Sequence, residues 1–368
     1  MAERCLSIDE SLPPKRAYSR TKSSARFQLE EEIASTYHST EQKDPYCAIL
    51  PSGMAAISAC FYAFFGNPGE KTLLLSNELY CDTPTCAASW RKEYNFKRQT
   101  FDVCDSQWLL NYCKKSQSPT MMFLESCSNP SGKILDWSII AELKKLNPNL
   151  VICVDNTWLT SIFFNPFCYG VDVVLESMTK YRSAGRVIGG FVCGQQKFIE
   201  VVKKYITLNG MFIGADHCEI FTRAQKNLHQ RVSNASELAQ KVAEWLEKDS
   251  NVTVLTPSLP AHPCFKIFNG YCNLKTSPSV FLIHIKSNCS LRDIENVKYP
   301  HGLRKETSYG SAHSKIDPWP RLGSSGDYFA TKNTLQQGVW LRISVGYDDE
   351  FLNLRKNLQT VIEHFQGI

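Results

Sequence analysis

The sequence predicts an α/β fold in which a large domain with a mostly parallel sheet is followed by a smaller α+β C-terminal domain. Over about 41–235, apolar runs typical of strands alternate with amphipathic segments typical of helices, the pattern of a parallel sheet covered by helices. From Val252 onward the strand-like runs are shorter, and a helical pattern over 351–365 follows. A length of 368 residues exceeds what one hydrophobic core usually holds, which also favours two domains.

This pattern divides the chain into three segments. Residues 1–40 read as an N-terminal arm that ends in a helix, 41–235 as the large domain and 236–368 as the C-terminal domain. The boundary falls inside a helical stretch whose apolar residues recur every three to four positions, which is typical of a helix with one face in a core. These residues are Phe221, Ala224, Leu228, Val232, Ala235, Leu238, Val242 and Trp245.

The run Val171-Asp-Val-Val-Leu-Glu-Ser-Met-Thr-Lys180 places reactive groups after a buried strand. Its apolar residues predict a strand covered on both faces, and Ser177 and Thr179 precede Lys180 at its carboxyl end. Open parallel sheets bind ligands at this end of their strands. A lysine there can form a Schiff base with an aldehyde cofactor while the hydroxyls hold its phosphate. Taken alone, a lysine after a strand is more often simply solvated.

Three upstream features suit the same ligand. Leu150–Asp155 is a second buried strand that ends in a carboxylate, which can cap the next helix or stabilise a positively charged ring nitrogen. The turn Ser52-Gly53-Met54 enters an apolar helix whose free N–H groups suit a phosphate. Tyr80 follows an apolar run and can stack on a flat cofactor, although a tyrosine in this position is often a core residue.

Composition argues against several other classes of protein. The net charge of +5 comes from interspersed charges, so we expect no nucleic-acid partner. No apolar run approaches the ~20 residues needed to cross a bilayer, and the first residues lack the apolar region of a signal peptide. We therefore expect a cytoplasmic protein with no membrane partner. The 15 cysteines include no C-x-x-C pair, which favours reduced thiols over disulfides or a metal site.

Six short motifs occur in order along most of the chain. They are Tyr18-Ser-Arg20, Ser52-Gly53-Met54-Ala-Ala, Glu125-Ser-Cys-Ser-Asn129-Pro130, Val154-Asp155-Asn156-Thr157, Ser177-Met-Thr179-Lys180-Tyr181 and Leu341-Arg342-Ile-Ser344-Val-Gly346. Together they resemble the cystathionine γ-synthase/γ-lyase (transsulfuration) family of pyridoxal phosphate (PLP) enzymes. This resemblance implies the aspartate-aminotransferase-like fold, PLP fold-type I, for the large domain.

The resemblance also implies roles for single residues. Lys180 would bind pyridoxal 5′-phosphate covalently and move protons between substrate carbons, Asp155 would stabilise the charged pyridine nitrogen, and Tyr80 would stack on the ring and assist catalysis. Arg342 would bind the substrate α-carboxylate through a bidentate fork. Further cofactor contacts implied by the resemblance are Ser52, Gly53, Met54, Ser177 and Thr179 at the phosphate and Asn129 at the phenolic oxygen.

The N-terminal motif, Tyr18-Ser-Arg20, bears on how the chains are expected to assemble. In the resembled family, the residues matching Tyr18 and Arg20 reach the cofactor phosphate in the neighbouring subunit. The resemblance therefore implies a homodimer with shared active sites, usually paired into a homotetramer.

The resemblance implies γ-elimination or γ-replacement on sulfur amino acids or O-acylhomoserine. Alternatives are β-elimination, as in cystathionine β-lyase, and a PLP-binding regulator without catalysis, whereas an aminotransferase of the same fold is disfavoured because the motifs match the transsulfuration branch. The segment Thr307-Ser308-Tyr309-Gly310 is similar to the family segment that lines the substrate side-chain pocket, with Ser308 as the expected substrate contact. Thr307 matches neither common choice at its position, and the loop after Lys180 is one residue shorter than in the family. The motifs therefore do not specify the substrate.

Overall fold

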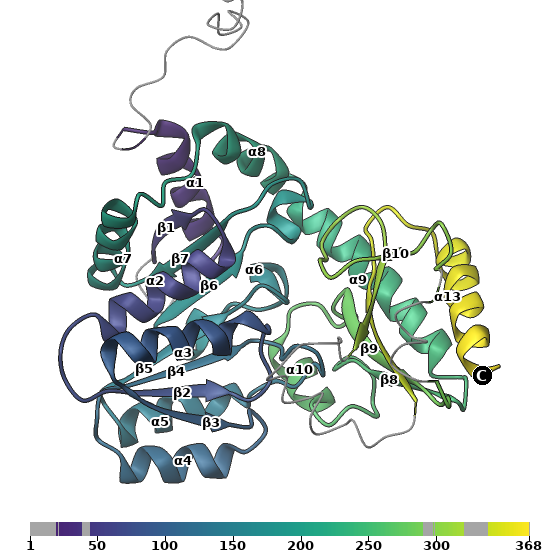
Figure 1. Ribbon diagram of the computed structural model, residues 1–368, viewed down its shortest axis with the longest axis horizontal. Coiled ribbons are helices and arrows are strands. Elements are labelled where there is room, and N and C mark those ends of the chain that lie inside the picture. Colours follow the sequence, from purple (N-terminus) through teal and green to yellow (C-terminus); the bar gives the residue numbers. More distant parts are fainter. Residues whose placement is uncertain are drawn as a thin grey trace, which may run out of the picture.

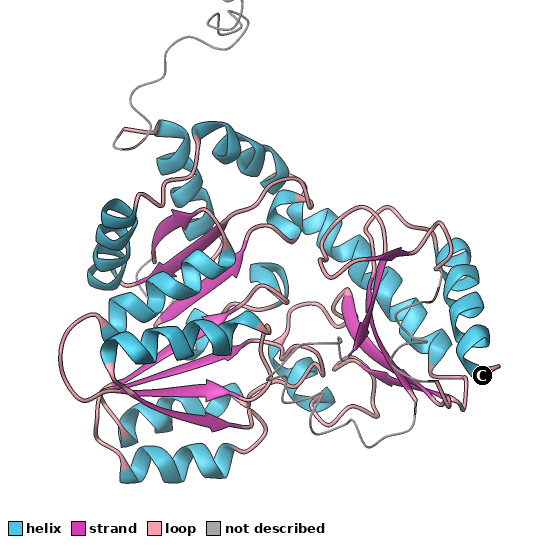
Figure 2. Ribbon diagram, in the orientation of Figure 1, coloured by secondary structure: helices cyan, strands magenta, loops and turns pink. Residues whose placement is uncertain are grey.

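Two sheets organise the chain, as Figure 1 and Figure 2 show. The computed structural model describes residues 20, 22–38, 45–289, 297, 299–319 and 338–367, so Tyr18 lies outside the described residues. The seven-stranded sheet contains β1 (Tyr46–Leu50), β2 (Thr72–Ser76), β3 (Lys97–Phe101), β4 (Thr120–Glu125), β5 (Leu150–Asp155), β6 (Val173–Ser177) and β7 (Gly190–Gly194). The five-stranded sheet contains β8 (Val252–Leu255), β9 (Val280–Ile285), β10 (Arg304–Lys305), β11 (Lys315–Trp319) and β12 (Val339–Ser344).

The seven-stranded sheet confirms the predicted mostly parallel arrangement. Its strand order is β1-β7-β6-β5-β4-β2-β3, in which β3, β2, β4, β5 and β6 pair in parallel and β7 pairs antiparallel with both β6 and β1. Every residue of β2 and β4 is buried, as expected for apolar strands covered on both faces. The carboxyl ends of β4, β5 and β6 therefore lie together at one edge.

Helices cover both faces of this sheet and form two separate cores. One core contains residues of α2 (Gly53–Phe65), α3 (Asp82–Tyr94) and α7 (Gln196–Asn209). The other contains residues of α1 (Ser24–Ser35), α4 (Ser106–Lys115), α5 (Ile140–Leu146), α6 (Thr160–Phe163), α8 (Ala215–Gln225) and α10 (Phe265–Tyr271). The helix at the end of the predicted arm is thus α1, which is packed into the large domain through Leu29 and Ile33.

The five-stranded sheet forms the smaller domain that the sequence predicts. Its order is β10-β11-β12-β9-β8, and every pair except β10–β11 is antiparallel. Its core includes residues of α9 (Leu228–Leu246) and of α13 (Phe351–Gln366), the helix expected over 351–365. Helix α9 contributes Leu228 and Val232 to the large-domain core and Leu238 and Val242 to the smaller one. The predicted boundary at 235/236 lies within this helix and stays a prediction.

Two absences hold for the part of the chain that the structure describes. None of its helices is both long and apolar enough to cross a membrane. No group of three or more His, Cys, Asp or Glu residues in this part could hold a metal ion.

Candidate active site

The N-terminus of α2 lies against the carboxyl end of β6. Ser52 caps this helix, and its Oγ accepts a hydrogen bond from the Ala55 N–H at 3.0 Å. A Cβ atom on Gly53 would lie only 2.7 Å from the Cβ of Ser177, so a glycine is needed for this close approach. The free N–H groups at a helix N-terminus favour an anion. With the Ser177 hydroxyl beside them, they form a candidate phosphate site.

Asp155 ends β5 and is held by Thr157. Its Oδ1 accepts hydrogen bonds from the Thr157 N–H at 2.9 Å and from the Thr157 hydroxyl at 2.5 Å. Burial raises the pKa of Asp155 to about 6, although the hydrogen bonds from Thr157 and the charge of Lys180 act in the opposite direction. A cationic ring nitrogen beside Asp155 would favour its charged form further.

Lys180 lies in the turn that follows β6. Burial, followed by the positive charges of Arg342 and Lys315, lowers its pKa to about 8. Near neutral pH the amine is therefore uncharged, and hence nucleophilic, in a much larger fraction of molecules than an ordinary lysine. The Thr179 hydroxyl holds this turn, because it donates to the Gly189 carbonyl at 3.3 Å and accepts from the Gly189 N–H at 3.2 Å.

Arg342 lies on β12 of the smaller domain, is 3% exposed and lines one cavity together with Asp155 and Lys180. Its guanidinium donates to Asn129 Oδ1 at 3.1 Å, to Asp317 Oδ2 at 3.0 Å and to the Thr307 carbonyl. Asp317 lies directly opposite Arg342 in the register of β11 and β12. These acceptors orient the planar guanidinium at the cavity wall, where it can bind a carboxylate.

Glu125 is a residue of the site for which no local sequence pattern predicts a role. It ends β4 directly beside Asp155 in the sheet register. Its carboxylate accepts from the Tyr80 N–H at 2.6 Å and from the Asn129 N–H at 3.1 Å. Burial, and then the nearby charge of Asp155, raises the pKa of Glu125 well above its ordinary value. Glu125 thus holds the backbone of two predicted cofactor contacts.

A cavity of about 220 Å³ lies between these elements. The predicted residues that line it are Ser52, Gly53, Met54, Tyr80, Asn129, Asp155, Ser177, Thr179, Lys180 and Arg342. Lining residues without a predicted role are Ile57, Cys81, Glu125, Thr157, Trp158, Thr307 and Tyr309. The predicted substrate contact Ser308 does not line the cavity, although both its neighbours do. The ring centroid of Tyr309 lies 5.5 Å from Lys180 Nζ, so Tyr309 brings this segment close to the lysine.

Arg20 does not line the cavity of its own chain. It is exposed, and its guanidinium lies 5.4 Å from the centroid of the Phe212 ring. The contact of Arg20 with a phosphate stays a prediction.

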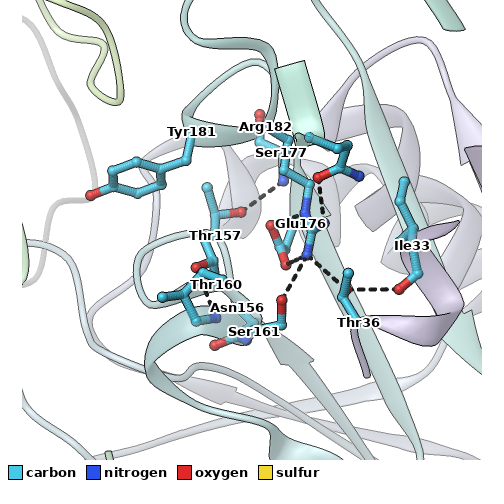
Figure 3. A network of polar contacts seen from close by, with 12 residues as sticks. Ile33, Thr36, Asn156, Thr157, Thr160, Ser161, Glu176, Ser177, Tyr181 and Arg182 are labelled. Atoms are coloured by element: carbon cyan, nitrogen blue, oxygen red, sulfur yellow. Dashed lines mark hydrogen bonds and ion pairs between the residues drawn. The ribbon is translucent and has the colours of Figure 1, made fainter. Parts of the chain in front are cut away.

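A buried polar network lies beside the turn that follows β6. Figure 3 shows this network around Glu176 and Arg182. Arg182 and Glu176 form an ion pair through two contacts of 2.8 Å, and their side chains are 0% and 1% exposed. Tyr37 donates to Glu176 and accepts from Asn156 at 2.9 Å. The remaining acceptors of the Arg182 guanidinium are Gln225, Thr36 and Ser161. The network ties the neighbours of Asp155 and Lys180 to α1 and α8.

These groups fit the PLP cofactor that the resemblance implied. The N-terminus of α2 and the nearby hydroxyls suit its phosphate, Asp155 suits its ring nitrogen, and the amine of Lys180 suits its aldehyde. A side chain at position 53 would clash with Ser177. Because Gly53 has none, the first turn of α2 can lie beside Ser177 with its N–H groups open to an anion.

Comparisons with known proteins agree with this chemistry. The family model described as Cys/Met metabolism PLP-dependent enzyme matches residues 7–359. L-alanine/L-glutamate racemase of Wolbachia pipientis wMel is 25% identical over 307 residues, covering 82% of this chain and 72% of that protein. L-methionine gamma-lyase of Treponema denticola is 28% identical over 313 residues, covering 82% of this chain and 75% of that protein. Cystathionine beta-lyase of Bacillus subtilis is 30% identical over 251 residues, covering 67% of this chain and 61% of that protein.

A solved structure shows the same fold. Cystathionine gamma synthase from Xanthomonas oryzae pv. oryzae, in complex with cystathionine, superposes with a TM-score of 0.83 at 22% identity, covering 97% of this chain and 90% of the other. This similarity confirms the predicted fold class.

Proposed function

Because the chain belongs to the Cys/Met metabolism family of PLP-dependent enzymes, we propose that it catalyses γ-elimination or γ-replacement on a sulfur-containing amino acid or an O-acylhomoserine. The observation that carries this proposal is the convergence of Lys180 and Arg342, from two different domains, on the cavity that Asp155 lines. The γ-lyases named among the relatives support γ-chemistry.

When bound, PLP supplies an electron sink that stabilises negative charge on the substrate carbons. The N-terminal turn of α2 and the hydroxyl of Ser177 would hold its phosphate. Asp155, oriented by Thr157, would keep a negative charge beside its ring nitrogen. Ser177 and Asp155 are themselves joined, because the Ser177 N–H donates to the Thr157 hydroxyl at 2.7 Å.

Arg342 would bind the α-carboxylate of the substrate and so orient the remaining bonds toward Lys180. With a pKa of about 8, the Lys180 amine can accept a proton from one substrate carbon and return it to another. Tyr80 lies at the mouth of the cavity, 39% exposed, where it can assist the leaving group.

β-Elimination is the second candidate, supported by the cystathionine β-lyases among the relatives. The two reactions differ in their products. The holoenzyme should be incubated with cystathionine, and separately with O-succinylhomoserine and cysteine. γ-Elimination releases 2-oxobutyrate from cystathionine, β-elimination releases pyruvate, and γ-replacement forms cystathionine. We expect 2-oxobutyrate or cystathionine as the main product, and neither with Lys180→Ala. Racemisation of alanine without any of these products would overturn the proposal.

We also propose that the protein is a cytoplasmic homodimer, paired into a homotetramer, in which Arg20 and Tyr18 complete the partner's site. The absence of Arg20 from the cavity of its own chain supports a shared site. The free cysteines of the described residues support a reducing compartment.

A further inference from the structure

Two cysteines outside the active-site cavity lie with their sulfur atoms 3.6 Å apart. Cys104 is exposed and lies in the turn between β3 and α4, whereas Cys264 is 1% exposed and immediately precedes α10. The two residues are far apart in sequence, so their contact joins the seven-stranded-sheet domain to the segment that follows β8. A disulfide needs a sulfur–sulfur separation of about 2.05 Å, so the two sulfur atoms must approach each other from this starting distance.

The surroundings of Cys264 favour a charged sulfur. Its Sγ accepts a hydrogen bond from the Ile134 N–H at 3.3 Å, and its own N–H donates to His262 Nδ1 at 3.1 Å. The other ring nitrogen of His262 lies 2.9 Å from the Ser131 carbonyl. The hydrogen bond from Cys104 lowers the pKa of Cys264 to about 5 despite its burial, and the same contact raises the pKa of Cys104 well above its ordinary value. Near neutral pH the two thiols therefore share one proton.

Two other thiol pairs provide an internal comparison. Cys47 faces Cys193 in the register of β1 and β7, and Cys153 of β5 hydrogen-bonds Cys60 of α2. All four side chains are buried. Burial raises the pKa of Cys47 and of Cys153 well above the ordinary value, so these thiols stay protonated and out of reach of solvent. The pair of Cys104 and Cys264 differs from both buried pairs, because it joins an exposed thiol to a buried one whose charged form is stabilised by the contact.

We propose that Cys104 and Cys264 form an oxidation site at which a peroxide converts the two thiols into a disulfide. The shared proton passes to Cys264, and the exposed Cys104 thiolate attacks the peroxide, breaking its O–O bond and forming a sulfenic acid. The released alkoxide, or hydroxide, takes the proton from Cys264. The Cys264 thiolate then attacks the Cys104 sulfur, the S–S bond forms and hydroxide leaves. Two electrons pass from the two sulfurs to one peroxide molecule.

The disulfide would form beside the loop that carries Asn129. Ile134 and Ser131 contact Cys264 and His262, and Asn129 in the same loop accepts a hydrogen bond from Arg342. The disulfide would therefore lie next to the loop whose Asn129 orients Arg342. Neither of its two cysteines lines the cavity.

The test is thiol mapping of the native holoenzyme. The protein is treated with hydrogen peroxide in small molar excess, blocked with N-ethylmaleimide and digested without reduction. We expect one cross-linked peptide pair containing Cys104 and Cys264, reversed by dithiothreitol, while Cys47, Cys60, Cys153 and Cys193 stay reduced. Cys104→Ser, a change at an exposed position, should abolish the cross-link, and the control Cys47→Ser should leave it unchanged.

The pH dependence provides a second readout that needs no variant. Because the pair has already lost one proton above a pKa of about 5, the rate of cross-linking should change less than about twofold between pH 6 and 8. An ordinary thiol with a pKa near 8.5 would react roughly 70-fold faster at pH 8 than at pH 6. The proposal would be overturned if Cys104 and Cys264 remained reactive toward N-ethylmaleimide while other thiols were oxidised. A cross-linking rate that rises with pH like that of an ordinary thiol would also overturn it.

Discussion

Thr157 donates a hydrogen bond of 2.5 Å from its hydroxyl to Asp155 Oδ1. The same hydroxyl accepts the Ser177 N–H at 2.7 Å. One oxygen atom therefore connects the carboxylate at the end of β5 to the backbone at the end of β6. This connection explains how two strand ends can present a carboxylate and a phosphate site to one ligand.

Thr157→Val keeps the shape of the side chain but removes both hydrogen bonds. A hydrogen bond to a charged group contributes about 1.5–3 kcal/mol, so we expect roughly 10- to 150-fold weaker binding of PLP. Thr157→Ser, which keeps the hydroxyl, should stay close to the parent protein. The measurement is a fluorescence titration of the apoenzyme with PLP. Equal affinity for Thr157→Val and the parent would show that Asp155 is oriented by other groups.

The ion pair of Glu176 and Arg182 predicts a large effect on stability. Arg182→Met would leave the buried Glu176 carboxylate without its cation, which typically costs about 3–5 kcal/mol. The measurement is urea unfolding of the apoenzyme. The double variant Glu176→Leu with Arg182→Met should lose less than the sum of the two single variants, because it leaves no unpaired charge. Single variants that unfold at the same urea concentration as the parent would refute this interpretation.

Much of the fold and part of the site could be predicted from local patterns. Lys180 and Asp155 each follow an apolar run, so their position at the carboxyl edge follows from the strand pattern alone. Arg342 has no comparable local signal, and its role came only from the resemblance. The contact of Arg342 with Asn129 depends on how two domains meet, which a single sequence does not display.

Other residues were missed for identifiable physical reasons. The role of Glu125 depends on the register that places it beside Asp155. Glu176 lies within an apolar strand pattern, and its burial becomes understandable only through Arg182. In the segment around Ser308, the structure places Thr307 and Tyr309 at the cavity instead, since the choice between neighbouring residues depends on backbone geometry.

The lowered pKa of Lys180 predicts the pH dependence of cofactor attachment. Only the neutral amine reacts with an aldehyde, so the rate of covalent PLP attachment to the apoenzyme should rise with pH and level off above about 8. Arg342→Gln removes one of the charges that lower this pKa and should move the midpoint upward. Arg342→Lys keeps the charge and provides the control. A midpoint near 10.5, the ordinary value for lysine, would contradict the expected effect of burial.

The proposed shared site predicts complementation between two inactive chains. Arg20→Ala should weaken PLP retention about 10- to 150-fold, because it removes a charge-assisted contact with the phosphate. In a mixed dimer of Arg20→Ala and Lys180→Ala chains, one site carries both changes and the other carries neither. Activity should therefore return at a PLP concentration at which the Arg20→Ala protein by itself binds no PLP. Mixed dimers confirmed by native mass spectrometry but still inactive would exclude a crossing arm.

The most direct test of the site is to identify the lysine that binds the cofactor. The holoenzyme is reduced with borohydride, which makes the linkage to PLP permanent, and its peptides are then sequenced by mass spectrometry. We predict a single modified lysine at Lys180, with no modified peptide from Lys180→Ala treated in the same way. Permanent attachment of PLP to another lysine, with Lys180 unmodified, would contradict the assignment of this cavity as the active site.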